Sequence, residues 1–511
     1  MPQTEDKNQP PQLTFDDLAK SVKANDLKVD IDVLKKAFAF ATEAHKGQRR
    51  RSGEPYVQHP LQTAITLAEM RLDQATLVAG LLHDVPEDTT FNLVEIEKRF
   101  GPEVGGLVAG ITKLGKIKYR GIERYAENLR KMFISMAQDV RVVLIKMADR
   151  LHNLRTIGAL PPEKQRRIAL EVLEIYAPIA NRLGMGRFKG TMEDLAFPIA
   201  YPEEWAWFKT HILPQYEVRV QEISSTISEL KKVLGANKIK VLDIHGRAKH
   251  YYSLYRKLLQ PQYNKNLNLV YDLVAIRVVV PTADDCYKAM GAIHTRFTPL
   301  PGRIKDYIAQ PKPNNYRSLH TTVFADGGKI VEVQLRDQKM HQQAEYGIAA
   351  HWHYKEMGKH FWTRISKTQG FHHKGYMVPK KMKWIQELAV WQQEVQDTRQ
   401  FLKRLKIDAF RDRIFVFTPN GDVIDLPEDA TPVDFAYYIH SDIGNTCVGA
   451  KINGKLEQLD TQLKNGDVVE IITDKSRKSP GRDWLRFVRT AAARNKIRST
   501  LRHDPEFTRR G

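Results

Sequence analysis

Apolar residues recur at helical spacing through residues 14–195. In VLKKAFAFATEAH, LQTAITLAEM, ATLVAGLLHD and VRVVLIKMADRLHNL they return every three or four positions, so one face of each segment is apolar. Breaks between such stretches fall at residues 52–55, Pro86, 101–102 and 161–162, where Gly or Pro occurs. The pattern predicts an all-helical domain, followed by a helical connector that ends near Gly235.

The hydrophobic period changes beyond Gly235. LVYDLVAIRVVV is rich in β-branched residues, DDCYKAMGAIHTRF keeps helical spacing, and LHTTVFADGGKIVEVQLR forms two alternating runs around Asp-Gly-Gly. Alternation separates two faces of the second run, with Glu332, Gln334 and Arg336 on one and Val331, Val333 and Leu335 on the other. These features predict a domain of strands and helices that contains a β-hairpin.

The last part of the chain predicts a small β-rich unit. Asn-Gly turns at 420–421, 453–454 and 465–466 separate short strands, and one helical piece spans 432–440. The expected division is a polar N-terminal segment (1–28), a helical domain (29–200), a connector (201–236), a strand-containing domain (237–354), a basic linker and helix (355–408), the β-rich unit (409–474) and a basic tail (475–511).

Charge narrows the range of partners. The 511 residues include 80 Lys and Arg against 60 Asp and Glu, a net +20, which favours polyanions such as nucleotides, RNA or the ribosome. The C-terminal tail contributes strongly to this positive charge. Its segment DWLRFVRTAAARNKIRSTLRH predicts an amphipathic basic helix suited to RNA phosphates, although an ordinary solvated helix fits almost equally well. Cys286 and Cys447 are too few and too far apart for a disulfide framework or thiolate zinc site. No apolar run is long enough to span a bilayer, so we expect a cytoplasmic chain without membrane contact.

A first candidate site lies in the helical domain. His59, His83, Asp84 and Asp149 form a mixed nitrogen and oxygen set that suits Mn²⁺, Fe²⁺ or Zn²⁺ with open positions for water. Glu87 and Asp88, one turn beyond His83, could orient or deprotonate that water or protonate a leaving group. A lone His-Asp pair is usually a helix cap or a surface pair, but the whole set favours a metal site.

A second candidate site lies on the predicted strands. Asp272 starts one strand and Glu332 lies in another, and carboxylates on neighbouring strands can bind Mg²⁺ against a triphosphate. Basic residues near the first strand supply donors for phosphate oxygens: Arg247, Lys249, Arg256, Lys257 and Arg277. A solvent-facing sheet would explain the alternation equally well, but not the density of basic side chains.

The segment RIKDYIAQPKPNNYRSLHTT at 303–322 lies between the strands. Pro311 and Pro313 cannot donate to a sheet, so its middle is predicted to be a loop. Its lysines and Tyr316 suit a phosphate-bearing ligand whose base stacks on the ring, although a solvated basic turn is equally compatible.

Several of these segments resemble long RelA/SpoT homologues. GQRRRSGEPYVQHP, LLHDVPEDT and KMADRLHNLRT are similar to the hydrolase domain, and GRAKHYYSLYRK, YDLVAIRV, VEVQLR and AEYGIAAHWHYK are similar to the synthetase domain. The resemblance implies an all-α HD-type domain that removes the 3′-pyrophosphate of ppGpp and pppGpp. It also implies a mixed-sheet, nucleotidyltransferase-like domain that transfers pyrophosphate from ATP to the 3′-hydroxyl of GDP or GTP. IFVFTPNGDVIDLPEDATPVDFAYYIHSDIG resembles a TGS domain, a β-grasp-like module that senses tRNA or the ribosome.

For the hydrolase, the resemblance implies that Mn²⁺ is held by His59, His83, Asp84 and Asp149, that Glu87 and Asp88 are the catalytic carboxylates, and that Arg50, Asn153 and Thr156 contact the nucleotide. Pro86 departs from the pattern, because relatives usually carry an aliphatic residue there. Proline constrains the turn that places Glu87, which bears on hydrolase efficiency.

For the synthetase, the resemblance implies that Asp272 binds Mg²⁺ and that Glu332 is a general base, a second metal ligand, or both. ATP would be held by Arg247, Lys249, Lys257 and Arg277, while Tyr316 would stack on guanine beside Lys305, Lys312, Asn314 and His320. Ala248 stands where relatives usually have proline. Residues 303–306 match the basic RxKD form of bifunctional relatives, where synthesis-only members carry an acidic form.

In the TGS-like unit, His440 matches an exposed histidine of the family and is a candidate RNA contact, although a helix cap is as good an interpretation. Long relatives continue past the point where this sequence stops, so it is either part of a longer chain or a short member. We therefore expect a bifunctional (p)ppGpp synthetase and hydrolase. The alternatives are an enzyme with one inactive half and a non-enzymatic adaptor that binds RNA or the ribosome.

Overall fold

The computed structural model describes residues 12–115, 121–312, 316–325, 328–347, 349, 413–464, 466–474, 476–477 and 479–502. The predictions for the linker and helix at 355–408 lie outside these residues. The chain divides into two compact units, one formed by 1–120 with 127–390 and the other by 121–126 with 391–511. Among the described residues, no helix has the length and apolar character needed to cross a membrane.

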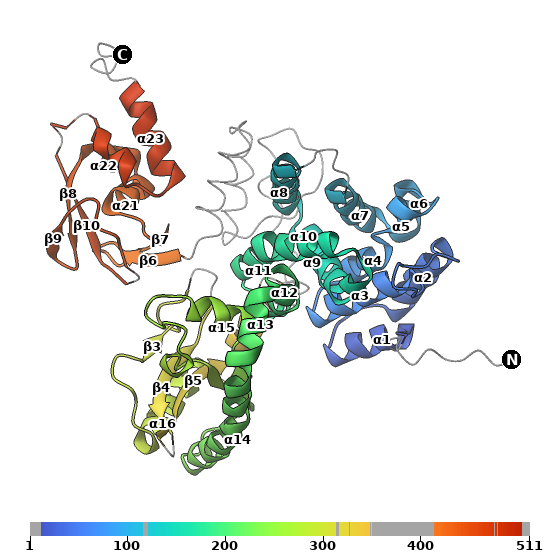
Figure 1. Cartoon of the computed structure of the whole chain (residues 1–511), viewed down its shortest axis with the longest axis horizontal. Helices are drawn as coiled ribbons and strands as arrows, with labels where there is room; N and C mark the ends of the chain where they lie inside the picture. Colours follow the sequence, from blue (N-terminus) through green and yellow to red (C-terminus); the bar gives the residue numbers. More distant parts are fainter. Residues whose placement is uncertain are drawn as a thin grey trace. The chain divides into compact units, whose positions relative to one another are not determined.

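The N-terminal half of the first unit is entirely helical, as predicted (Figure 1). Its elements are α1 (Phe15–Ala24), α2 (Ile31–Ala44), α3 (Gln58–Glu69), α4 (Gln74–Leu82), α5 (Val85–Asp88), α6 (Leu93–Phe100), α7 (Pro102–Gly115), α8 (Gly121–Gln138), α9 (Val140–Arg155), η1 (Ile157–Ala159), α10 (Pro162–Glu171), a π-helical turn η2 (Val172–Tyr176), α11 (Ala177–Arg182) and α12 (Gly186–Ala200). Helix starts follow the local sequence. Asp73 and Asp139 accept backbone hydrogen bonds as N-caps of α4 and α9.

The core of this half forms where α3, α4 and α9 pack on one another. Arg141 of α9 links the starts of α4, α7 and α9, because its buried guanidinium pairs with Asp73, Glu103 and Asp139. Helix α1 lies within the segment expected to be a polar N-terminal arm, yet it packs on α3 and buries Leu18. Its apolar stripe is short but sufficient to anchor it.

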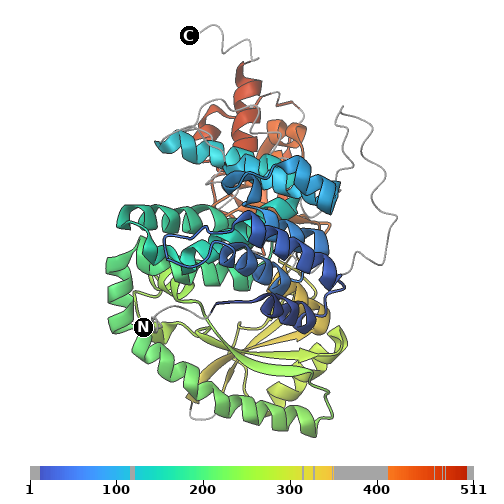
Figure 2. The same cartoon turned by 90° about the vertical axis from the view of Figure 1, so that its right-hand side faces the viewer.

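The connector consists of α13 (Pro202–His211) and α14 (Leu213–Ala236), which leads into a five-stranded sheet. The strands are β1 (Asp243–Ala248), β2 (Val274–Val280), β3 (Lys305–Asp306), β4 (Leu319–Phe324) and β5 (Ile330–Asp337), in the order β1-β2-β5-β4-β3. Only β2 and β5 are parallel, so the sheet is mixed as expected. Figures 1 and 2 show α14 running along the sheet, and α14 also contacts α16 (Ala283–Arg296).

The predicted alternation on β5 is confirmed. Val331, Val333 and Leu335 join the core under α14 and α16. The polar set on the opposite face remains outside that core. The hairpin between β4 and β5 is also confirmed, although the turn residues 326–327 lie outside the described part of the chain.

Helix α12 joins the helical half to the sheet-containing half. It contacts α15 (Tyr251–Leu258) and α17 (Gln338–Tyr346). Asp194 of α12 accepts hydrogen bonds from the Tyr252 backbone N–H at 3.1 Å and pairs with His250 Nδ1 at 2.7 Å. A Cβ at Gly347 would lie 2.2 Å from the Leu183 carbonyl oxygen, so the two halves meet closely here. The start of α15 is therefore held by the helical half.

The second unit contains β6 (Arg413–Phe417), β7 (Val423–Pro427), α21 (Pro432–Ile439), α22 (Ser441–Thr446), β8 (Cys447–Ile452), β9 (Lys455–Glu457), β10 (Val469–Thr473), η7 (Arg482–Arg486) and α23 (Ala491–Arg502). The strands form a sheet in the order β10-β8-β9 and a β6-β7 pair. The predicted single basic helix is wrong, because the segment divides into η7 and α23. Trp484, Val488 and Ile497 are buried against α21, so the apolar side of this segment is packed rather than solvated.

Candidate active sites

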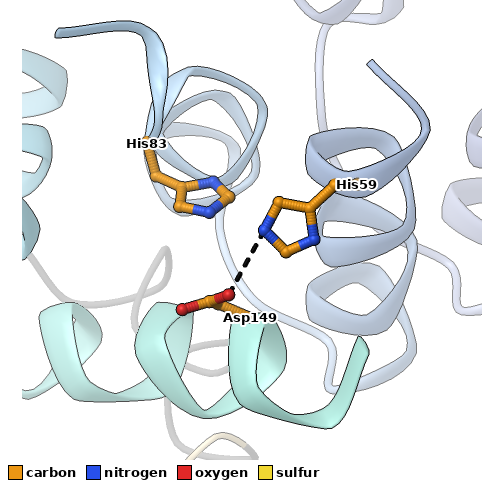
Figure 3. Close-up of side chains that lie close together, drawn as sticks. All are labelled: His59, His83 and Asp149. Carbon is orange, nitrogen blue, oxygen red and sulfur yellow. Dashed lines mark ion pairs between the residues drawn. The ribbon is translucent and has the colours of Figure 1, made fainter. Parts of the chain in front are cut away.

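The predicted metal ligands in the helical half converge from three helices (Figure 3). His59 lies in the first turn of α3, while His83 caps the end of α4 and Asp149 lies in α9. Ligand atoms of His59, His83 and Asp149 lie within 4.8 Å of one another and all three side chains are buried. Asp84 completes the set, because its carboxylate oxygens lie 3.2 Å from His83 Nε2 and 3.4 Å from His59 Nε2.

The chemistry of this cluster fits a divalent metal. Burial lowers the pKa of His59, which leaves the imidazole neutral and able to coordinate. Burial opposes ionisation of Asp149, but Lys146 at 2.7 Å and His59 hold its pKa well below the usual range. Within the described residues, buried His83 Nε2 has no hydrogen-bond partner, which is the state expected of a metal ligand.

The three predicted nucleotide contacts of the hydrolase lie together. Arg50 donates from Nη2 to Asn153 Oδ1 at 2.6 Å and from Nη1 to Thr156 Oγ1 at 3.4 Å. Arg50 Nη1 also lies 3.1 Å from His152 Nδ1. Burial, with the nearby His59 and Arg50, lowers the pKa of His152 to about 3, so this ring is neutral. The arginine fork is thereby aimed by the C-terminal turn of α9.

Glu87 and Asp88 are exposed and lie in the short helix α5, which follows directly after Asp84. Pro86 occupies the first turn of this helix, where proline is well tolerated because no backbone donor is needed. Tyr56 donates to Asp88 Oδ2 at 2.5 Å and to Asp84 Oδ2 at 3.2 Å. Desolvation and the neighbouring Asp84 and Asp88 raise the pKa of Glu87 above its ordinary value, which favours the protonated acid.

The second site forms where β2 and β5 run side by side. Asp272 lies just before β2, and Ala275 of β2 pairs in register with Glu332 of β5. Lys249 Nζ lies 2.8 Å from Asp272 Oδ2 and Lys257 Nζ lies 2.6 Å from Oδ1. Partial burial would raise the pKa of Asp272, but the two lysines hold it well below its usual range.

Glu332 is held by two neighbours on the polar face. Gln334 donates from Nε2 to Glu332 Oε1 at 2.7 Å, and His320 Nδ1 lies 3.3 Å from the same oxygen. Burial favours the neutral acid, but His320 and Gln334 lower the pKa of Glu332 to about 2. The carboxylate is thus ionised and fixed toward the acceptor side, where Tyr316 Oη lies 2.8 Å from His320 Nε2.

The remaining predicted contacts frame this site. Lys305 of β3 pairs in register with His320, and Lys312 Nζ lies 5.2 Å from the Tyr316 ring centroid. Arg247 of β1 lies opposite Ala275, and Arg277 donates to Glu345 Oε1 at 2.6 Å. Asn314 lies outside the described residues.

Sequence reasoning missed four side chains at the two sites, Tyr56, Lys146, His152 and Glu345, and it placed Arg336 on the strand face of Glu332 without giving it a role. His152 and Lys146 each lie three positions from Asp149 in α9, so helical spacing alone could have placed both near it. Glu345 could not be found this way, because its contact with Arg277 joins residues 68 positions apart.

His440 lies at the junction of α21 and α22. It is the C-cap of α21 and also the N-cap of α22, where its Nδ1 accepts a hydrogen bond from the Asp442 backbone N–H at 3.2 Å. Its side chain is 66% exposed, so capping leaves the ring accessible.

Three family profiles match the chain in order. They are the HD domain over residues 37–186, the "Region found in RelA / SpoT proteins" over 246–359 and the TGS domain over 414–473. The chain is 46% identical, over 93% of its length, to a protein of Myxococcus xanthus named GTP pyrophosphokinase. It is 44% identical, over 92% of its length, to the bifunctional (p)ppGpp synthase/hydrolase SpoT of Escherichia coli (strain K12).

These matches cover 61% and 65% of the two relatives, so the chain spans less than two thirds of their length. Among solved structures, a metazoan orthologue of SpoT that hydrolyses ppGpp is 32% identical, with 25% of this chain and 70% of that chain covered and a TM-score of 0.21. Three modules in the order HD, RelA/SpoT and TGS, with matches along almost the whole sequence, show that the chain belongs to the long RelA/SpoT homologue family.

Proposed function

We propose that the chain catalyses two opposing reactions at two separate sites. In one, ATP transfers a pyrophosphoryl group to the 3′-oxygen of GDP or GTP, which yields (p)ppGpp and AMP. In the other, water releases that group as pyrophosphate. The observation that carries the proposal is the coexistence of a buried His and Asp cluster with a second pair of carboxylates, Asp272 just before β2 and Glu332 on β5.

The synthetase residues suit phosphoryl transfer, which depends mainly on positioning and charge. Lys249 and Lys257 pair with Asp272 in this structure. Together with Arg247 and Arg277 they would neutralise the negative charge of the ATP phosphates. Asp272 and Glu332 would hold Mg²⁺, which would supply positive charge against the phosphate oxygens. Because the pKa of Glu332 is about 2, we assign it to metal binding and to orienting the 3′-hydroxyl rather than to strong proton abstraction.

The hydrolase residues suit attack by water on a 3′-diphosphate. Mn²⁺ held by His59, His83, Asp84 and Asp149 would lower the pKa of its bound water. Glu87 would exchange protons with the water or the leaving oxygen. Arg50, aimed by Asn153 and Thr156, would contact the nucleotide phosphates.

A further part of the proposal is that the TGS unit contacts tRNA or the ribosome. Arg486, Arg498 and Arg502 are exposed on η7 and α23, and His440 keeps an accessible ring. Binding through these groups should weaken steeply as salt rises.

The test is incubation of the whole chain with ATP plus GDP and Mg²⁺, and separately with ppGpp and Mn²⁺, followed by nucleotide chromatography. Glu332→Gln should abolish synthesis alone and Asp84→Ala hydrolysis alone. Wild-type protein that performs one reaction only would support an enzyme with an inactive half. Salt-sensitive RNA binding without any turnover would support the adaptor.

A further inference from the structure

Arg336 is the most deeply buried charged group beside the second site. It lies on the polar face of β5 with no exposed surface. Its guanidinium carbon lies 4.7 Å from the centroid of the Tyr316 ring. Nη2 donates to the Tyr316 hydroxyl and, at 3.2 Å, to Gln334 Oε1.

This placement opposes stability. Within the described residues, Arg336 Nε and Nη1 have no hydrogen-bond partner. Glu345 Oε1 lies 3.7 Å from Nη1, which is too far for a good hydrogen bond. Buried charges with unsatisfied donors cost free energy, and an apolar side chain of similar size would fill the same space more favourably. A role at the site accounts for this cost.

The contacts of Arg336 identify that role. The Tyr316 hydroxyl makes two hydrogen bonds, one accepted from Arg336 and one with His320 Nε2 at 2.8 Å. The Tyr307 ring makes a T-shaped contact with the same ring, with centroids 6.0 Å apart. A ring fixed in this way loses little further freedom when a base stacks on it, so binding is strengthened by preorganisation.

We propose that Arg336 is a positioning residue that sets the orientation of Tyr316 for stacking of the acceptor guanine. The inference rests on the proposed function, since it takes Tyr316 as part of the acceptor site. Glu345 supports the arrangement from α17, because the same oxygen that faces Arg336 accepts the 2.6 Å hydrogen bond of Arg277.

The test measures GDP binding by calorimetry without ATP, so that no turnover is required. Arg336→Met retains an unbranched side chain but removes the charged guanidinium. It should weaken GDP binding about tenfold, the usual effect of losing a hydrogen bond to a charged group. Binding of a non-hydrolysable ATP analogue should change less than twofold. Arg219→Met on α14, which removes an arginine bonded to Leu267 and Asn268, is the control and should change neither affinity.

A double-mutant cycle with Tyr316→Phe separates this role from packing. If Arg336 acts through the hydroxyl, Arg336→Met should add little to the loss caused by Tyr316→Phe. Independent losses, or equal losses of GDP and ATP analogue binding, would overturn the proposal. If Arg336→Met fails to fold, Arg336→Lys keeps the charge without the planar fork and should give the same selective loss.

A spectroscopic measurement reports on the same contact. Burial would raise the pKa of Tyr316, but Arg336 and His320 lower it to about 8. The tyrosinate absorbance that Tyr316→Phe removes should titrate at higher pH in Arg336→Met, and an unchanged midpoint would contradict the contact. GDP binding by wild type without product formation would refute the proposed synthesis but leave this inference standing.

Discussion

Gly190 offers a sharp test of the contact between the helical half and the sheet. It lies in α12 beneath the ring of His250, and a Cβ there would be 2.0 Å from His250 Cδ2 and 2.2 Å from Nε2. His250 is held in place by Asp194 at 2.7 Å and follows Lys249, which contacts Asp272. Gly190→Ala therefore forces His250 to move or the helix to shift.

The expected magnitude follows from opposing effects. Alanine is favoured over glycine within a helix by about 0.5–1 kcal/mol. Overpacking a well-filled contact costs about 1–3 kcal/mol, and loss of the bond between His250 and Asp194 costs about 1 kcal/mol more. Gly190→Ala should therefore destabilise the first unit by about 1–3 kcal/mol and raise the KM for ATP.

Urea denaturation followed by circular dichroism measures the effect. The control is Gly291→Ala in α16, an exposed helical position where a Cβ would meet no atom within 4 Å. That substitution should stabilise the protein by about 0.5–1 kcal/mol. If Gly190→Ala proves as stabilising as Gly291→Ala, the close contact between α12 and His250 is refuted.

Three further predictions concern other buried polar groups. Arg141→Met should lower the free energy of unfolding by about 2–4 kcal/mol, because it leaves Asp73, Asp139 and Glu103 without their shared partner. Chemical denaturation measures this change, and a value below about 1 kcal/mol would contradict the bridging role. Glu332 has a pKa of about 2 against an ordinary value of 4.5, so its ionisation contributes stability that is complete above pH 4.5 and is lost as the pH falls through about 2. The unfolding free energies of wild type and Glu332→Gln should therefore differ by a constant amount above pH 5, and the difference should shrink by up to about 3 kcal/mol on further acidification. A difference that grows on acidification would contradict this linkage. Asp434 is fully buried and accepts hydrogen bonds from the backbone N–H groups of Arg489 at 3.0 Å and Thr490 at 2.7 Å. Asp434→Ala should therefore release α23 and speed tryptic cleavage between 482 and 502. Asp442→Ala, at an exposed position, is the control, and equal cleavage rates of the two variants would contradict the anchoring role of Asp434.

Periodicity predicted the parts of the fold that depend on local spacing. Helical spacing in KMADRLHNLRT places Asp149 and Asn153 on adjoining turns of α9 with Thr156 at its C-cap, and period-2 alternation places Glu332 on the polar face of β5. Both follow from residues close in the sequence. The candidate ligands on α3 and α4 came from composition and family resemblance, and the structure brings them within reach of Asp149.

Contacts between distant segments were not predictable in the same way. The pairing of Asp194 with His250 spans 56 positions, and the burial of Arg336 depends on Tyr316 and Glu345 arriving from other elements. The basic segment at the C-terminal end of the described chain has the composition of a solvated helix. Its apolar residues pack on α21 because the backbone donors of Arg489 and Thr490 meet a buried carboxylate on Asp434.

The central claim is that one chain both builds and removes a 3′-diphosphate. Its most direct test uses ATP labelled in the β-phosphoryl group, incubated with GDP and the wild-type chain, with products separated over time. We predict one AMP for each labelled ppGpp during synthesis, followed by release of the label as pyrophosphate when Mn²⁺ is added. Formation of ADP, or label that leaves as orthophosphate, would contradict pyrophosphoryl transfer and its reversal by this protein.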